Sequence, residues 1–294
     1  MNIEETVLDI RRILEEKRKE FQLTFEEESH KYTMLGLDGK LTDNWPSVSK
    51  VMKAFYDEFP SEKKALEMSG GNPDKADELL NEWKLSGEYS TNIGSRVHFL
   101  LEKHSLDMFN YEKAIREPIY ECDPLQILKS DSMVTAGKQF LEVMKERGAH
   151  LIDTEIVLGH PELGYTGQGD TGWLIENKNK DGYGFIITDY KTNKEKNFIT
   201  QKYIKPMRTP FEYLPNNALG HYHTQLPFYG KLLLKMLEGT KYENIKILGC
   251  IIVRLTDERE FIEYRVEKKT EFLAKISKPY LTKNTLHKFH QSKA

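Results

Sequence analysis

Apolar residues near the start of the chain recur three or four positions apart. Residues 3–20 place such a stripe among many charged side chains, which predicts an amphipathic helix. Residues 21–34 instead hold two short runs of strand-forming residues joined by acidic and polar ones, which favours a β-hairpin. After the hairpin, Ser47 can cap the start of another helix.

The next region is predicted to be mainly helical. In residues 56–90, prolines and glycines interrupt short helical patterns, which indicates a helical subdomain or insertion with mobile connections. A clearer helical pattern covers residues 91–105, with Thr91 or Asn92 as its cap. The pattern is then weak until a helix resumes over residues 134–147.

Strand patterns dominate the second half of the chain. Apolar runs separated by turn residues predict an antiparallel meander of three strands, over residues 151–158, 172–176 and 184–191. A helix is expected over residues 219–238, and it is followed by two strands, over residues 246–254 and 260–266. A basic helical tail is expected to close the chain.

Composition and charge narrow the class of protein. The chain has 294 residues, long enough for a substantial core, and 38% are apolar and 30% charged, as in a globular protein. No run approaches the roughly 18–20 consecutive apolar residues of a membrane helix, and the N-terminus is acidic, unlike a signal peptide. We therefore expect a cytoplasmic protein with no membrane partner.

The cysteine count and the net charge exclude further classes. Two cysteines, Cys122 and Cys250, are too few for a zinc ribbon or a four-cysteine iron–sulfur cluster, so no iron–sulfur cofactor is expected. The net charge of −3 argues against a strongly electrostatic, non-specific coat on nucleic acid. A local basic groove is still compatible with this net charge.

The run from Phe185 to Thr192 carries the first chemical signal. Apolar and β-branched residues lead into Asp189, Tyr190 and Lys191, and strand alternation sets Asp189 and Lys191 on one face. A buried carboxylate and ammonium need a partner, a metal or a catalytic role. Upstream, Asp170 follows glycines that allow a tight turn. Two carboxylates and a lysine at strand ends would suit a hard divalent cation.

Each of these residues also has a purely structural explanation. Asp189 and Lys191 can form an ion pair at a sheet edge, and Asp170 can be a turn residue. His98 shares a helix face with Glu102 four residues on, where a histidine is more often structural than a ligand. Two further alternatives are an exposed residue at Glu155 and a helix-surface pair of Gln225 and Tyr229.

Four spaced motifs in one order resemble those of the RecB-like branch of the PD-(D/E)XK nucleases. They run from Gly94 to His98, from Gly167 to Asp170, from Asp189 to Lys191, and from Gln225 to Tyr229. The segment 46–49 also resembles the lead-in of phage and mitochondrial single-strand exonucleases in this branch. The chain lacks the cysteines of the cluster-bearing members.

The resemblance implies a fold and a division of the chain. The fold would be α/β, with a restriction-endonuclease-like three-layer core in which helices flank a central mixed β-sheet, plus an N-terminal hairpin and helical elaboration. Residues 1–90 would form a helix, hairpin and helical subdomain packed on the core. Residues 91–294 would form the nuclease core and its basic tail.

The resemblance also implies a metal site and residue roles. His98, Asp170, Asp189 and the backbone carbonyl of Tyr190 would bind Mg²⁺ or Mn²⁺, and oxygen ligands with one imidazole suit these ions. Lys191 would orient or help to deprotonate the attacking water and would stabilise charge on the phosphorane. The implied catalytic set is Lys191, Asp170, Asp189 and Glu155.

Other residues are assigned to the surroundings of that site. Glu102 and Glu155 are candidates for side chains that hold the metal ligands in place or that bind a second metal. Gln225 and Tyr229 would grip the phosphate backbone or brace Asp189. Pro227 departs from a regular helix between them, so the helix either starts near Thr224 or kinks at the proline.

A basic stretch suggests where DNA would bind. From Lys191 to Arg208, six Lys or Arg accompany one acid, with aromatic residues interleaved, a pattern that suits a single strand in a groove. The predicted DNA contacts are Lys194, Lys196, Lys202 and Arg208. A solvated loop is the alternative, and a solvated helix is the alternative for the basic tail.

Together these features predict a metal-dependent DNA exonuclease that hydrolyses phosphodiester bonds from DNA ends and leaves 5′-phosphates. Its substrate would be single-stranded DNA or an end-bearing duplex, and the resemblance suggests recombination, repair or replication in a bacterial or phage-infected cytoplasm. One alternative is a catalytically inactive nuclease fold that serves as a DNA-binding or protein-interaction module. Another is a sequence-specific endonuclease, which would cut circular DNA.

Overall fold

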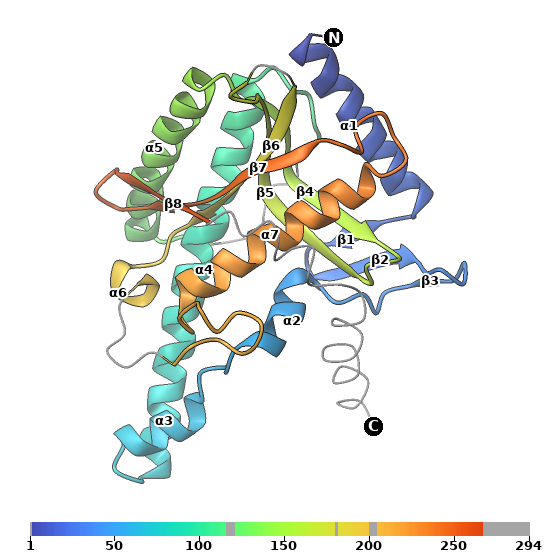
Figure 1. Cartoon of the computed structure of the whole chain (residues 1–294). Helices are drawn as coiled ribbons and strands as arrows, with labels where there is room; N and C mark the ends of the chain where they lie inside the picture. The colour runs from blue at the N-terminus through green and yellow to red at the C-terminus, as the bar shows by residue number, and fades with distance from the viewer. Residues whose placement is uncertain (1, 116–120, 180–181, 200–204, 267–294) are drawn as a thin grey trace.

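The fold is organised around a mixed sheet of five strands in the order β4-β5-β6-β7-β8 (Figure 1). A computed structural model describes residues 2–115, 121–179, 182–199 and 205–266. The strands are β4 (His150–His160), β5 (Tyr165–Glu176), β6 (Tyr183–Lys191), β7 (Lys246–Leu255) and β8 (Phe261–Arg265). The first three pair antiparallel, which confirms the predicted meander, whereas β6 and β7 are parallel.

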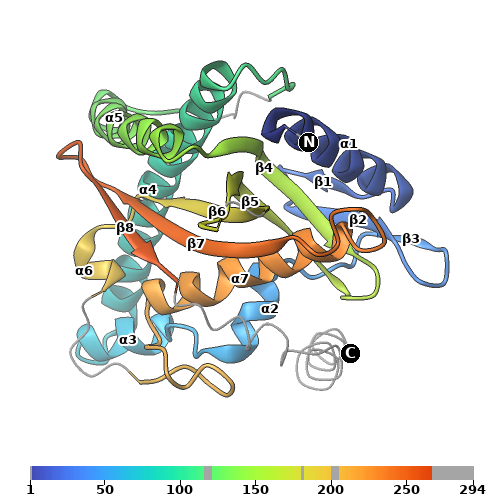
Figure 2. The same ribbon diagram turned by 45° about the horizontal axis from the view of Figure 1, so that its top comes forward.

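Helices pack on both faces of this sheet (Figure 2). One apolar core joins α1 (Ile3–Glu20), α2 (Val48–Met52) and α7 (Ala218–Met236) to the strands. A second core joins the strands to α4 (Pro73–Met108) and α5 (Pro124–Glu146). The parallel step from β6 to β7 requires a crossover, and α7 supplies it. The predicted α/β class with a mixed sheet flanked by helices is confirmed.

The N-terminal region adds a small separate sheet. Strands β1 (Thr24–Glu26) and β2 (Lys31–Leu35) form the expected hairpin, and a short β3 (Leu41–Thr42), which was not predicted, pairs with β2. Ser47 caps α2 as expected, because its side chain accepts from the backbone N–H of Lys50 at 3.3 Å. A 3₁₀ turn, η1 (Lys53–Phe55), follows.

The helical region differs from its prediction at two helix starts. Helix α3 (Ser61–Met68) is followed by α4, one continuous helix of 36 residues, so the cap predicted at Thr91 or Asn92 is wrong. Asn72 caps α4 instead, with Pro73 in its first turn, and the expected boundary between residues 90 and 91 falls inside the helix. The first part of α4 projects with α3 from the body of the molecule (Figure 1).

The other new start is that of α5, which begins ten residues before the predicted one. Asp123 and Gln126 form a reciprocal capping box, with hydrogen bonds of 2.8 and 2.9 Å, and Pro124 occupies the first helical position. Pro124 is thus a helix-start signal in the stretch where the sequence pattern is weak.

Helix α7 begins at Ala218 with Asn217 as its cap, so a start near Thr224 is wrong and Pro227 lies inside the helix.

Two predicted features, the basic tail and Lys202, lie outside the described residues. Among the described residues, none of the helices combines the length and the apolar character that spanning a bilayer would require.

Candidate metal centre

Three carboxylates lie side by side on the adjacent strands β4, β5 and β6. Thr154 pairs with Thr171 and Ile156 pairs with Gly169, so Glu155 lies opposite Asp170. Thr171 pairs with Thr188, and one further step in that register sets Asp170 beside Asp189. We call Glu155, Asp170 and Asp189 the acidic row. Like charges at neighbouring cross-strand positions destabilise a sheet unless a cation joins them.

The β4 strand changes its facing direction at Glu155. Alternation should set Thr154 and Ile156 on one face, yet Thr154 donates to Glu102 of α4 at 3.0 Å, whereas Ile156 packs in the core that contains α7. The reversal occurs where Glu155 adopts φ +43°, in the left-handed region that costs a non-glycine residue about 1–3 kcal/mol. The carboxylate of Glu155 is thereby aimed toward Asp170 and His98.

Asp170 lies within β5 rather than after a tight turn, which corrects the expectation for the glycines before it. Those glycines serve close packing. A Cβ on Gly167 would lie 2.6 Å from the ring of Tyr229 on α7. The hydroxyl of Tyr229 in turn accepts from Gln225 at 2.6 Å, so the motif on α7 supports the strand that carries Asp170.

Helix α4 delivers the imidazole of His98 to the acidic row. Nδ1 of His98 lies 3.5 Å from Oδ2 of Asp170 and 3.6 Å from Oε1 of Glu155. One turn earlier, a Cβ on Gly94 would lie 3.5 Å from the Thr192 hydroxyl, so the small residue lets α4 approach the end of β6. The spacing from Gly94 to His98 thus places the imidazole beside the acidic row on a closely packed helix.

His98, Glu155 and Asp170 can each offer one ligand atom within 4.8 Å of the others. This group differs in one member from the expected set, because it includes Glu155 and not Asp189. Asp189 is instead held by the ammonium of Lys191 in an ion pair. The backbone N–H of Tyr190 donates to Asp170 at 2.6 Å, so the Tyr190 backbone adjoins the site, and its carbonyl stays a predicted ligand.

Burial and crowding of like charges set the electrostatics of this site. Burial raises the pKa of Asp189 to about 6, and the neighbouring Asp170 adds to the rise. Burial also raises the pKa of Asp170. For His98, burial opposes the charged form, but Asp170 and Glu155 outweigh it and raise the pKa to about 9. The folded protein without a metal therefore binds protons at Asp189 and His98 more tightly than the unfolded chain does.

Lys191 is a fixed cation in this setting. Burial disfavours its charge, but Asp189 and Asp170 outweigh burial and raise the pKa of the ammonium above its ordinary value. Nζ also lies 4.5 Å from the ring centre of Tyr222, a favourable cation–π position. Lys191 is thus arranged to donate hydrogen bonds and to attract negative charge.

The chemistry of these donors fits Mg²⁺ or Mn²⁺. Two partly buried carboxylates and one imidazole converge, and hard divalent ions prefer oxygen ligands while Mn²⁺ accepts an imidazole. Cysteine is not among the side chains of this group, and the two cysteines of the chain are free, one of them buried. The donors favour neither zinc–thiolate nor iron–sulfur chemistry.

Two acids that adjoin the row belong to a different arrangement. Glu102 contacts Thr154 and lies 3.7 Å from Nζ of Lys113, and Asp153 pairs with Lys113 at 2.9 Å and with Arg18 at 3.4 Å. We call Glu102, Asp153, Arg18 and Lys113 the paired cluster. Neither Asp153 nor its two cations were singled out in the sequence, because long-range ion pairs have no local pattern.

A cleft of about 1720 Å³ opens beside the site. His98, Glu155 and Lys191 line it, and so do Lys194 and Lys196, two of the predicted DNA contacts. Another predicted contact, Arg208, instead forms an ion pair with Asp57. Arg254 also lines the cleft and was not predicted, although it is the last residue but one of the apolar strand β7, and Lys191 is the last of β6, which is a usable sequence signal.

No protein-family model matches this chain, and comparison with curated proteins gives no match.

Proposed function

We propose that this protein is a Mg²⁺- or Mn²⁺-dependent DNA exonuclease of the RecB-like PD-(D/E)XK type, and that its sheet is a restriction-endonuclease-like core. The substrate would be single-stranded DNA or a duplex with ends. The observation that carries the proposal is the acidic row on three adjacent strands, with His98 against Asp170 and Glu155 and with Lys191 two residues beyond Asp189.

Each residue has a role in phosphodiester hydrolysis. A divalent ion held by His98, Glu155 and Asp170 would polarise a phosphoryl oxygen and lower the pKa of a bound water. Asp189 holds the Lys191 ammonium in place, so the cation is positioned before negative charge develops on the phosphoryl oxygens. Because the pKa of Lys191 is raised, charge stabilisation and water orientation suit it better than proton removal.

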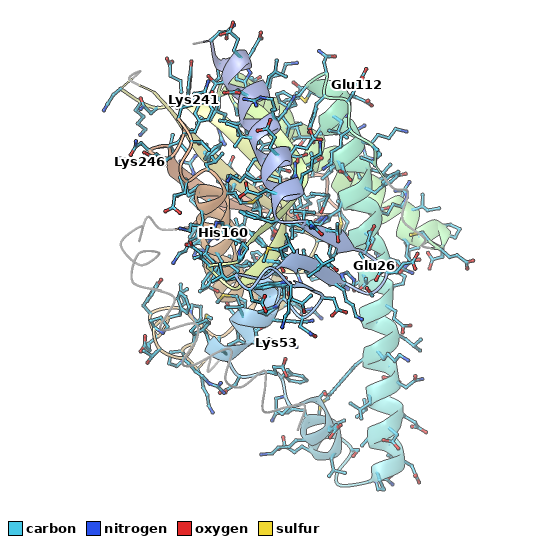
Figure 3. The ribbon with its side chains drawn as sticks, turned by 90° about the vertical axis from the view of Figure 1, so that its right-hand side faces the viewer. Glu26, Lys53, Glu112, His160, Lys241 and Lys246 are labelled. Atoms are coloured by element: carbon cyan, nitrogen blue, oxygen red, sulfur yellow. The ribbon has the colours of Figure 1, made fainter. Side chains whose placement is uncertain are left out.

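The decisive experiment compares Lys191→Ala with the wild type on linear DNA labelled at the 5′ or the 3′ end, in Mg²⁺ or Mn²⁺ and with EDTA. Loss of one preorganised donor should lower cleavage by at least about 10²–10³-fold. Lys246→Ala is a matched control because Lys246 is exposed at the far end of β7. Figure 3 shows it on the opposite side of the molecule from Glu26, a residue of the cleft.

Three results would contradict the proposal. Cleavage by Lys191→Ala at the wild-type rate would remove Lys191 from the chemistry. Metal-independent DNA binding without cleavage by the wild type would indicate an inactive nuclease fold that serves as a binding module. Cutting of closed circular DNA would indicate an endonuclease.

A further inference from the structure

Arg254 occupies a position in the cleft that parallels that of Lys191. The two residues are in register on the parallel strands β7 and β6, where Lys191 is the last residue of β6 and Arg254 is the last but one of β7. Both side chains line the cleft that contains His98 and Glu155. In α/β sheets, ligands bind at the carboxyl ends of parallel strands. Arg254 on β7 therefore places a second cation, beside Lys191 on β6, at the edge of the sheet where a ligand would bind.

The guanidinium of Arg254 is buried with little compensation. Arg254 is 6% exposed, and its Nε has no hydrogen-bond partner among the described residues. Its ion pair is with Glu195 of α6 (Glu195–Phe198), where Nη2 and Oε2 are 3.7 Å apart, beyond hydrogen-bond distance. A buried charged group without hydrogen bonds is costly, so this site has unused capacity for an anion.

The ion pair with Glu195 is easily exchanged. The side chain of Glu195 is 63% exposed, so its carboxylate can return to water at small cost when another anion takes its place. Lys191 differs in this respect because its partner Asp189 is buried and would be left unpaired. Of these two strand-end cations, Arg254 is the one that is free to change its partner.

We propose that Arg254 binds a phosphate of the DNA backbone beside the scissile one, and that Glu195 occupies the guanidinium until DNA displaces it. The proposal rests on the proposed nuclease function. A guanidinium presents a planar set of donors that matches two phosphate oxygens, which a lysine cannot reproduce. Arg254 is thus a substrate-positioning residue, one strand further from the acidic row than Lys191.

The first test measures the affinity for a single-stranded oligonucleotide in the Lys191→Ala background, where the DNA stays intact. Adding Arg254→Met should weaken binding by about tenfold or more, and should reduce the slope of log K against log salt by about 0.7–1. Arg254→Lys should restore the salt slope but only part of the affinity. Arg265→Met is the matched control, an exposed arginine on the same sheet.

The second test uses Glu195→Gln, which should leave the fold intact because the side chain of Glu195 is exposed. This change should tighten DNA binding in the presence of Arg254 and should have no effect in an Arg254→Met background. Glu258→Gln at the same cleft controls for general removal of an acid, because its effect should be the same in both backgrounds. Equal effects of Glu195→Gln on DNA affinity with and without Arg254 would contradict the displacement of Glu195 from Arg254 by DNA.

The third test locates the phosphate. Single phosphates of the oligonucleotide are replaced in turn by neutral methylphosphonates. One position near the cleavage site should weaken binding to the protein with Arg254 and not to Arg254→Met. A purely structural Arg254 would lower the melting temperature and leave every position equally sensitive in both proteins. Wild-type protein that neither binds nor cuts DNA would contradict the proposed function itself, whereas normal cutting with unchanged binding by Arg254→Met would contradict this inference alone.

Discussion

Two buried groups of charged residues meet on β4, and they differ in how their charges balance. In the paired cluster, Asp153 and Glu102 face two cations, and Asp153 also accepts from the backbone N–H of Thr154 at 2.9 Å. In the acidic row, three carboxylates share Lys191 and an imidazole. The paired cluster is electrically complete, and the acidic row has an excess of negative charge.

If the acidic row binds a metal as proposed, the two groups represent a structural and a functional use of buried charge. A balanced group stabilises the fold only if all its members are present, and loss of one member leaves an uncompensated charge. An unbalanced group destabilises the fold until an external cation binds, and such sites have strongly shifted pKa values. Asp153 and Glu155 are two residues apart, yet they should respond to substitution in opposite ways.

The largest expected effects come from exchanging acid for amide in each group. Asp153→Asn should lower the free energy of unfolding by about 3–5 kcal/mol, because Arg18 and Lys113 lose their buried partner, and should leave Mn²⁺ affinity unchanged. Asp170→Asn should remove most Mn²⁺ binding and should preserve or raise stability without metal, because it relieves repulsion. Asp189→Asn should also weaken Mn²⁺ binding. Calorimetry with Mn²⁺ and urea unfolding in EDTA measure both properties.

The contrast between the two groups would be wrong if both kinds of variant lost stability, if both lost Mn²⁺ affinity, or if the two effects were exchanged. A large stability loss in Asp170→Asn would mean that the acidic row holds the fold together. Unchanged Mn²⁺ affinity in both Asp170→Asn and Asp189→Asn would move the metal site elsewhere.

A second, smaller effect is the dependence of stability on pH without metal. The folded-state pKa of Asp189 is raised from 3.8 to about 6, and that of His98 from 6.5 to about 9. The folded protein therefore binds more protons than the unfolded chain between pH 3.8 and 6 and between pH 6.5 and 9. The free energy of unfolding should fall as pH rises through each window, by on the order of 3 kcal/mol per window.

Mn²⁺ should reverse this trend, because its ligands must lose protons before they bind and its affinity therefore grows with pH. Thermal unfolding from pH 4 to 9, in EDTA and in Mn²⁺, measures both slopes. His98→Gln should flatten the upper window in EDTA. Parallel slopes with and without Mn²⁺ would show that the acidic row does not bind the ion.

The sequence revealed the parts of the site that depend on local patterns. Asp189 and Lys191 stand two residues apart at the end of an apolar run, and both are where strand periodicity places them. His98 and Asp170, expected together, do meet. The role of Glu155 depends on its left-handed backbone and on the register between β4 and β5, which no local pattern specifies.

The fold shows the same division between local and long-range information. The meander, the hairpin and α1 follow from periodicity and turn residues. The continuity of α4 past Thr91 does not, because the side chain of Asn92, a candidate cap, instead donates to the distant backbone carbonyl of Glu121. Lys113 was missed because its partner Asp153 comes from a distant part of the chain, whereas the position of Arg254 near the end of an apolar strand was a local signal that could have been used.

The smallest expected effect concerns Glu102, which the sequence placed near the metal and the structure places in the paired cluster. Burial raises the pKa of its carboxyl group, and its contact with Lys113 is long, at 3.7 Å. Glu102→Gln keeps an acceptor for the Thr154 hydroxyl. We therefore expect a stability change of about 1 kcal/mol or less and a change in Mn²⁺ affinity of less than about threefold, or roughly 0.7 kcal/mol.

Glu155→Gln is the matched contrast, because it makes the same chemical change across the boundary between the two groups. It removes a carboxylate that lies 3.6 Å from the His98 imidazole, so Mn²⁺ affinity should fall by at least about tenfold, or 1.4 kcal/mol. Calorimetry on the two variants side by side places the boundary of the metal centre. If Glu102→Gln loses Mn²⁺ as fully as Glu155→Gln does, then Glu102 is a ligand, and the paired cluster is part of the metal centre.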